Sequence, residues 1–168
     1  GVVIFPGSNC DHDAYYSLRK VLNYDVEFLW HKDTDLKQSS VILLPGGFSY
    51  GDYLRTGAIA RFSPIMNSVI SFANKGGIVI GICNGFQILL EAGLLPGVMI
   101  RNNSLNLARK DVYLKTENRE TIFSAEISEA TKALKIPIAH GEGNYFADIE
   151  LLKELEANRQ ILFRYSDE

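Results

Sequence analysis

The chain has 168 residues, 46% of them hydrophobic and 22% charged, a balance that is typical of one globular domain and excludes extended disorder. The formal net charge is −3 and no basic tract is present, which argues against nucleic acid or an anionic membrane as a partner. Cys10 and Cys83 stand outside any CxxC or His/Cys cluster and no apolar run reaches the roughly 18–20 residues of a membrane helix, so we expect a cytoplasmic protein without a disulfide framework, a metal site or a membrane span.

Short apolar runs alternate with helical patterns in the first half of the chain, which predicts βα units and a mainly parallel sheet. The run 2–5 is rich in β-branched residues and fully apolar, which is typical of a parallel strand that is buried on both faces. The predicted strands are 2–5, 26–30, 41–44 and 78–82, the last as the central strand, and the predicted helices are 11–22 with Asp11 as N-cap and a helix that starts at Pro64 behind Ser63.

The pattern is weaker after residue 100, but further elements are still predicted. Strands are expected at 111–116, within 133–139 and at 160–165, and a helical segment is expected over 148–158 with Asp148 as N-cap and Asn158 as C′, the position after the C-cap. No repeat or linker separates these elements from the earlier ones. Residues 1–168 are therefore expected to form a single domain.

The segment Gly81-Ile82-Cys83-Asn84-Gly85 has the G-x-nucleophile-x-G form of a nucleophile elbow. In such a turn the nucleophile has a strained backbone, and glycines two residues away avoid steric clashes. The following helix N-terminus stabilises a thiolate, and the next backbone N–H can bind an oxyanion. We therefore predict Cys83 as the nucleophile and Asn84 as an oxyanion donor. The alternative is a small buried cysteine at a strand end beside glycines that pack a helix. Cys10 follows "PGSN" without an elbow, and a structural role is expected for it.

An oxyanion hole needs a second donor, and the loop after the strand at 41–44 can supply it. This loop turns on consecutive glycines, Gly46 and Gly47. Since the carboxyl ends of parallel strands meet at one edge of a sheet, an amide of this loop can face the elbow. We predict Gly47 as the second donor, with a simple tight turn as the alternative.

Longer motifs add a family resemblance to this local reading. With "PGSNCD", "GGFSYGDYLRTGAIARFSPIM", "GICNGFQIL", "GLLPG" and "PIAHGEGNY", the chain resembles the class I glutamine amidotransferases and, more closely, the glutaminase subunits of phosphoribosylformylglycinamidine synthases. The motifs occur in order along nearly the whole chain. The resemblance implies an α/β flavodoxin-like domain with a mostly parallel central sheet flanked by helices.

The resemblance also implies a reaction and its residues. Cys83 is expected to attack the side-chain amide of glutamine and release ammonia, and the glutamyl thioester is then hydrolysed to glutamate. Gly47 and Asn84 match the two oxyanion-hole amides of the family. Gln87 matches a residue that helps to bind the substrate glutamine, with an ordinary polar residue at the helix start as the alternative.

The family takes its histidine base and the orienting carboxylate from a His-Pro-Glu segment near the C-terminus, and this sequence contains no such segment. We therefore expect residues 1–168 to lack the C-terminal segment of the domain and to hydrolyse glutamine very poorly by themselves. His140 and Gly141 match a different motif, whose loop lies beside the glutamine site and whose backbone is expected to contact the substrate or the partner. A triad of Cys83, His140 and Glu142 is the minority alternative.

The resemblance implies partners as well. It implies a synthetase subunit that binds ATP and Mg²⁺ and uses the ammonia in purine biosynthesis, together with a small third subunit in many bacteria. This chain has no G-x-x-x-x-G-K-[ST] loop, so no cofactor is expected here. Tyr50, Tyr53 and Arg55 are candidate interface residues or pack over the mouth of the site. Two rival functions stay open: a cysteine hydrolase or peptidase that uses His140, and a non-catalytic scaffold domain.

Overall fold

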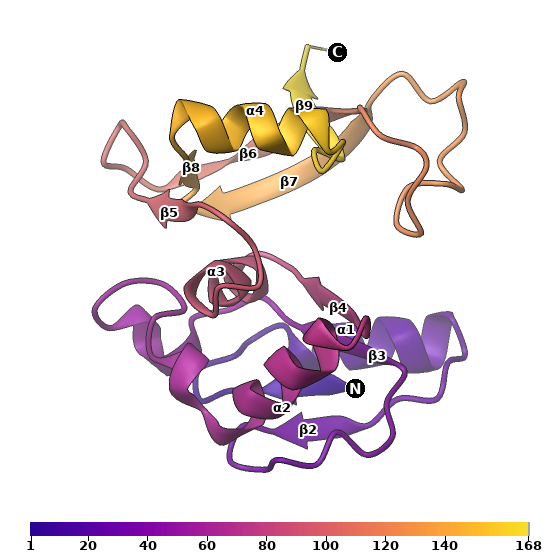
Figure 1. The fold of residues 1–168 in the computed structure, drawn as a ribbon, viewed down its shortest axis with the longest axis vertical. Helices are drawn as coiled ribbons and strands as arrows, with labels where there is room; N and C mark the ends of the chain where they lie inside the picture. Colours follow the sequence, from indigo (N-terminus) through magenta and orange to yellow (C-terminus); the bar gives the residue numbers. More distant parts are fainter. Residues whose placement is uncertain (168) are drawn as a thin grey trace. The chain divides into compact units, whose positions relative to one another are not determined.

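The computed structural model describes residues 1–167, which form two compact units, residues 1–98 and residues 99 onward (Figure 1). The first unit contains a parallel sheet with the strand order β2-β1-β3-β4. Each strand falls within a run that the sequence predicts as a strand, so the prediction of an α/β fold with a mostly parallel sheet is confirmed. The elements of this unit are β1 (Val2–Ile4), α1 (Asp11–Tyr16), β2 (Phe28–Trp30), β3 (Val41–Leu44), α2 (Pro64–Asn74), β4 (Ile78–Gly81) and α3 (Asn84–Glu91).

Side chains alternate between the two faces of this sheet, as strand geometry requires. On one face Val3 and Ile42 pack with apolar side chains of α2 and α3. On the other face Val2 and Leu43 pack with α1. Each aliphatic side chain buried in this way contributes about 2 kcal/mol relative to an exposed one. The sheet therefore gives the segment between β4 and α3 a rigid base.

β4 is not a central strand in the described structure, and that prediction is wrong. It lies at the edge of the sheet that residues 1–167 form, with β3 beside it. Its four residues are only half-buried, whereas Ile42 and Leu44 of β3 are fully buried. An apolar run identifies a strand, but its place in the sheet depends on the direction of the crossovers.

The first predicted helix is present as α1 followed by a π-helical turn, Ser17–Val21. Its predicted N-cap is wrong by one residue, because Cys10 occupies that position and Asp11 is the first helical residue. The carboxylate of Asp11 accepts the N–H of its neighbour His12 at 2.9 Å. No helix in the described part of the chain is both long and apolar enough to cross a membrane.

The second unit contains an antiparallel sheet with the strand order β7-β6-β9 and a small sheet of β5 and β8. The sequence pattern predicts the first three strands but not β5 and β8, because three residues are too few to show a period of two. The elements are β5 (Val98–Ile100), β6 (Ala108–Thr116), β7 (Leu134–His140), β8 (Asn144–Phe146), α4 (Ile149–Ala157) and β9 (Phe163–Ser166).

The ends of α4 test two cap predictions. Asp148 is the N-cap as predicted, and its carboxylate accepts the N–H of Leu151 at 2.8 Å. Asn158 is the C-cap, so its predicted place at C′, the position after the C-cap, is wrong by one residue. That position belongs to Arg159, which has the left-handed φ of +54° usually reserved for glycine or asparagine.

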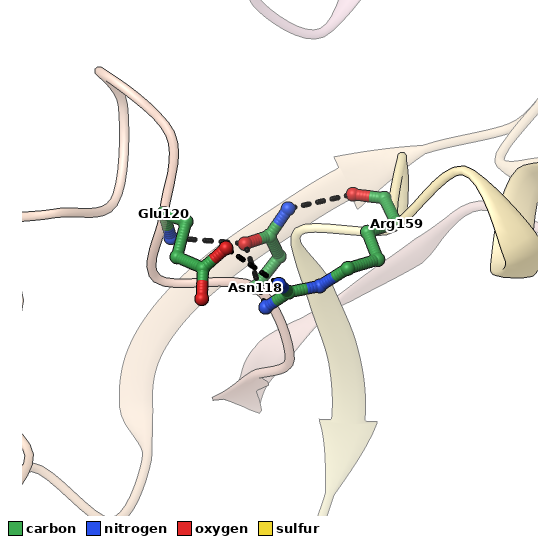
Figure 2. Close-up of polar contacts among 3 residues, drawn as sticks. All are labelled: Asn118, Glu120 and Arg159. Atoms are coloured by element: carbon green, nitrogen blue, oxygen red, sulfur yellow. Dashed lines mark hydrogen bonds and ion pairs between the residues drawn. The ribbon is translucent and has the colours of Figure 1, made fainter.

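Asn118, a buried residue just after β6, holds this unusual turn (Figure 2). Its Nδ2 donates to the carbonyl oxygen of Arg159 at 2.6 Å, and its Oδ1 accepts the N–H of Glu120 at 2.9 Å. The guanidinium of Arg159 pairs with the Glu120 carboxylate at 2.5 Å. One carboxamide thus joins the end of β6 to the turn between α4 and β9.

Candidate active site

Cys83 lies at the turn between β4 and α3, and the backbone there has the geometry of a nucleophile elbow. Its φ of 54° and ψ of −111° are values that residues with a side chain rarely adopt. The flanking glycines are required by space: a Cβ at Gly81 would lie 2.7 Å from the backbone of Gly85, and a Cβ at Gly85 would lie 1.9 Å from the carbonyl oxygen of Leu44. The thiol is exposed at the N-terminus of α3, where the helix dipole favours negative charge.

The glycine loop after β3 reaches this elbow. A Cβ at Gly46 would lie 3.3 Å from the Cβ of Cys83, so the loop backbone passes close beside the nucleophile. Gly47 has a φ of +131°, and a Cβ there would lie 2.5 Å from the backbone nitrogen of Asn9. Both glycines therefore allow a close approach of chain segments and do more than turn the loop.

A short antiparallel bridge fixes the glycine loop against the loop after β1. The N–H of Phe48 donates to the carbonyl of Gly7 at 3.1 Å, and the N–H of Cys10 donates to the carbonyl of Gly46 at 3.3 Å. Since the neighbours make these bonds, the N–H of Gly47 takes no part in the bridge. Its role as an oxyanion donor stays a prediction.

The side chain of Asn84 ties the elbow to the turn that follows the glycine loop. It is only 2% exposed. Its Oδ1 accepts the N–H of Ser49 at 3.1 Å, and its Nδ2 donates to Asp52 at 3.3 Å and to the Oε1 of Gln87 at 3.0 Å. As the first residue of α3, Asn84 also has a backbone N–H without a partner in the helix. Local sequence predicts a role only for this N–H and not for the side chain, since the side chain's partners lie up to 35 residues away.

Gln87 lies one turn into α3 and is buried, with its Oε1 bonded to Asn84. Gly57 packs against this turn with a φ of +78°, and a Cβ there would lie 2.9 Å from the backbone nitrogen of Ile88. The predicted glutamine-binding residue is therefore held beside the elbow by a closely packed loop.

Tyr50 follows the glycine loop in the sequence, and its side chain holds this part of the chain against neighbouring segments. Its hydroxyl lies 2.7 Å from the Nδ1 of His31 and 2.8 Å from the Oγ of Ser63. Ser63 precedes Pro64 at the start of α2 as predicted, but its hydroxyl bonds to Tyr50 and does not cap the helix. Burial lowers the pKa of His31, so the neutral ring is favoured. These contacts fit the packing role that was the alternative to an interface for Tyr50.

Other large side chains of the same loop lie at the surface, unlike that of Tyr50. Arg55 forms a bidentate ion pair with Glu91 of α3, with distances of 2.6 and 2.8 Å. Tyr53, Leu54 and Phe48 are exposed, Leu54 to 91%. The loop is thus held in place by the contacts of Tyr50 and Arg55, and it also exposes large apolar side chains.

His140 and Gly141 belong to the second unit, at the end of β7 and just after it. The buried Asn102 holds this segment: its Nδ2 donates to the carbonyl of His140 at 2.8 Å, and its N–H donates to the carbonyl of Gly141 at 2.9 Å. Its Oδ1 accepts the N–H of Gly143 at 3.0 Å and lies 2.9 Å from the Nδ1 of His140. Asn102 belongs to no chemical motif, so local sequence gives no signal for this role. His140 also lines an open pocket of about 580 Å³ on this unit.

The groups around Cys83 suit acyl chemistry. A thiol stands at a helix N-terminus with the glycine loop close beside it, which provides a nucleophile together with backbone amides that can serve a developing oxyanion. Within residues 1–167, no group of three or more His, Cys, Asp or Glu side chains is arranged to hold a metal ion.

Comparisons with known proteins agree with this geometry. The chain matches the CobB/CobQ-like glutamine amidotransferase domain over residues 1–168. It is 59% identical to phosphoribosylformylglycinamidine synthase subunit PurQ of Moorella thermoacetica, over 98% of this chain and 70% of that protein, and 55% identical to the subunit of the same name from Salinibacter ruber, over 99% and 70%. The solved structure of PurLQS from Thermotoga maritima matches with a TM-score of 0.85 and 40% identity, over 99% of this chain and 74% of that chain. The chain therefore belongs to the CobB/CobQ-like glutamine amidotransferases, in the group of the PurQ subunits of phosphoribosylformylglycinamidine synthase.

Proposed function

We propose that the chain acts as a glutaminase with Cys83 as its nucleophile. The sulfur attacks the side-chain amide carbon of glutamine, ammonia leaves, and water hydrolyses the glutamyl thioester to glutamate. The observation that carries the proposal is the strained elbow, with its thiol at the N-terminus of α3. The N–H groups of Gly47 and Asn84 bind the oxyanion of each tetrahedral intermediate, and one such donor typically contributes about 10²-fold or more to kcat.

We assign the substrate contacts to Gln87 and to the backbone of His140 and Gly141. The burial of Gln87 beside the elbow supports the first assignment, and the ordered backbone held by Asn102 supports the second. A triad of Cys83, His140 and Glu142 is less favoured, because a catalytic carboxylate orients the ring through Nδ1 and the Nδ1 of His140 is paired with the Asn102 carboxamide. We propose instead that the base comes from a His-Pro-Glu segment, which residues 1–168 do not contain.

We further propose that the ammonia passes to a synthetase subunit that makes phosphoribosylformylglycinamidine in purine biosynthesis, with ATP and Mg²⁺ bound by that partner and with a small third subunit in the assembly. The names of the relatives support this assignment, as does the match to PurLQS. The exposed Phe48, Tyr53 and Leu54 offer the partner an apolar surface in the loop that carries Gly47. Both cysteines are free thiols, as in the reducing cytoplasm, where we place the reaction.

The test is covalent trapping of the subunit assembled with its synthetase, using a diazoketone analogue of glutamine and intact-mass measurement. We expect one adduct on the wild-type chain, none on Cys83→Ala, and one on the matched control Cys10→Ala. Excess glutamine should slow the labelling. A scaffold domain would give no adduct, and a peptidase would hydrolyse peptides without preferring glutamine. An adduct that persists in Cys83→Ala would contradict the assignment of the nucleophile.

A further inference from the structure

A second thiol lies beside the nucleophile. A structural role is predicted for Cys10, but its sulfur lies against the same point of the glycine loop as the Cβ of Cys83. A Cβ built on Gly46 would lie 3.4 Å from the Sγ of Cys10 and 3.3 Å from the Cβ of Cys83. Because residue 46 is a glycine, no side chain occupies that point. Both thiols are free and exposed.

The position of Cys10 is fixed by its backbone. Its N–H donates to the carbonyl of Gly46 at 3.3 Å, and its carbonyl accepts the N–H of Ala14 at 2.9 Å. Cys10 is also the N-cap residue of α1, which packs on the sheet. The thiol is thus held next to the glycine loop and does not depend on a flexible segment to reach it.

We propose that Cys10 and Cys83 form an oxidation site that takes a peroxide as its oxidant and yields a reversible disulfide. In the first step the Cys83 thiolate attacks one peroxide oxygen, the O–O bond breaks and hydroxide leaves. The sulfur is oxidised by two electrons to sulfenic acid, and the peroxide is reduced. In the second step the Cys10 sulfur attacks the sulfenic sulfur, an S–S bond forms and the S–O bond breaks. The leaving hydroxide takes up the proton from the Cys10 thiol and becomes water.

The disulfide protects Cys83 from irreversible oxidation and, as long as it is present, prevents Cys83 from attacking a substrate. Sulfenic acid that is not captured by a thiol proceeds to sulfinic acid, which thiols do not reduce, whereas a dithiol returns a disulfide to two thiols. The consequence for activity rests on the proposed role of Cys83. The disulfide itself rests only on the placement of the two sulfur-bearing side chains.

The pKa of Cys10 predicts how the second step depends on pH. Partial burial raises this pKa, and the negative charges of Asp13, of a Cys83 thiolate and of Asp11 raise it further. Cys10 is therefore mostly protonated near neutral pH. Since the thiolate is the attacking form, disulfide formation should become faster between about pH 7 and pH 9.

The experiment treats the subunit, assembled with its synthetase, with hydrogen peroxide, alkylates the remaining thiols, and analyses a tryptic digest without reduction. We expect a cross-link between the peptide that ends at Arg19 and the peptide Gly76–Arg101, two hydrogens lighter than the two together. Dithiothreitol should remove the cross-link and restore glutaminase activity. In Cys10→Ser, which keeps a good N-cap residue, Cys83 should gain two oxygens and activity should not return.

The oxidation products of Cys83 and its trapping by the glutamine analogue distinguish a failure of the oxidation site from a failure of the glutaminase proposal. If wild type and Cys10→Ser accumulate sulfinic acid at Cys83 equally fast and no cross-linked peptide forms, the oxidation site does not exist. If the cross-link forms in a chain that shows no trapping by the glutamine analogue, the oxidation site stands and the glutaminase proposal fails.

Discussion

The buried carboxamide of Asn84 is the best place to test how the elbow is supported. Its three hydrogen bonds reach Ser49, Asp52 and Gln87. Asn84→Ala would leave the N–H of Ser49 without its acceptor, and an unpaired buried group costs about 1–3 kcal/mol. The cavity left by the lost carboxamide adds to this cost. We therefore expect the free energy of unfolding of the first unit to fall by about 3 kcal/mol.

The same substitution should reduce catalysis in a chain that still folds. The turn that holds Ser49 and Asp52 directly follows the glycine loop, so its release should disturb the spacing of the two oxyanion amides. We expect kcat for glutamine hydrolysis in the assembled enzyme to fall about tenfold, less than the loss that follows removal of a whole oxyanion donor.

Tryptophan fluorescence during urea unfolding measures the stability effect. Trp30 is the only tryptophan of the chain and lies in β2, so its signal reports the first unit. With an m-value of about 1.5 kcal/mol per molar urea, the expected loss lowers the midpoint by about 2 M. The matched control is Ser49→Ala, because the Ser49 hydroxyl is buried without a hydrogen-bond partner in the described structure and its removal should change stability by less than about 1 kcal/mol. Equal midpoints for Asn84→Ala and wild type would refute this account of the elbow.

Further substitutions test the packing at Gly85 and the effect of burial on His31. Gly85→Ala would place a Cβ 1.9 Å from the carbonyl oxygen of Leu44, so we expect a loss of more than about 3 kcal/mol in urea unfolding followed by far-UV circular dichroism, which reports both units. Gly141→Ala, with open space around its position, should be nearly neutral in the same measurement, and similar stability of the two variants would count against the steric argument. Burial lowers the pKa of His31 in the folded chain, so the unfolded chain binds the proton more tightly and stability should decline as the pH falls from about 6.5 towards the folded pKa. His31→Gln should flatten this decline in urea midpoints measured from pH 7 to pH 5, and an unchanged slope would show that another group is responsible.

Much of the site can be predicted from local sequence because its geometry is local. The spacing of Gly81, Cys83 and Gly85 predicts the elbow, since a tight strand-to-helix turn excludes a Cβ at both flanking positions. The strands of the parallel sheet follow from short apolar runs, and the cap at Asp148 follows from its place before a helical pattern. In each case the physical cause acts over a few residues.

Other features were decided only by contacts between distant segments. Local sequence does not specify that β4 lies at the edge of the described sheet, that the Asn84 carboxamide binds the Ser49 N–H, or that Asn102 holds the loop of His140. Nor does it place the Cys10 sulfur beside Gly46, 36 positions along the chain. These arrangements depend on how the crossovers bring the loops of different strands to one edge. The partner of a polar or sulfur-bearing side chain is therefore determined only when the fold has brought those loops together.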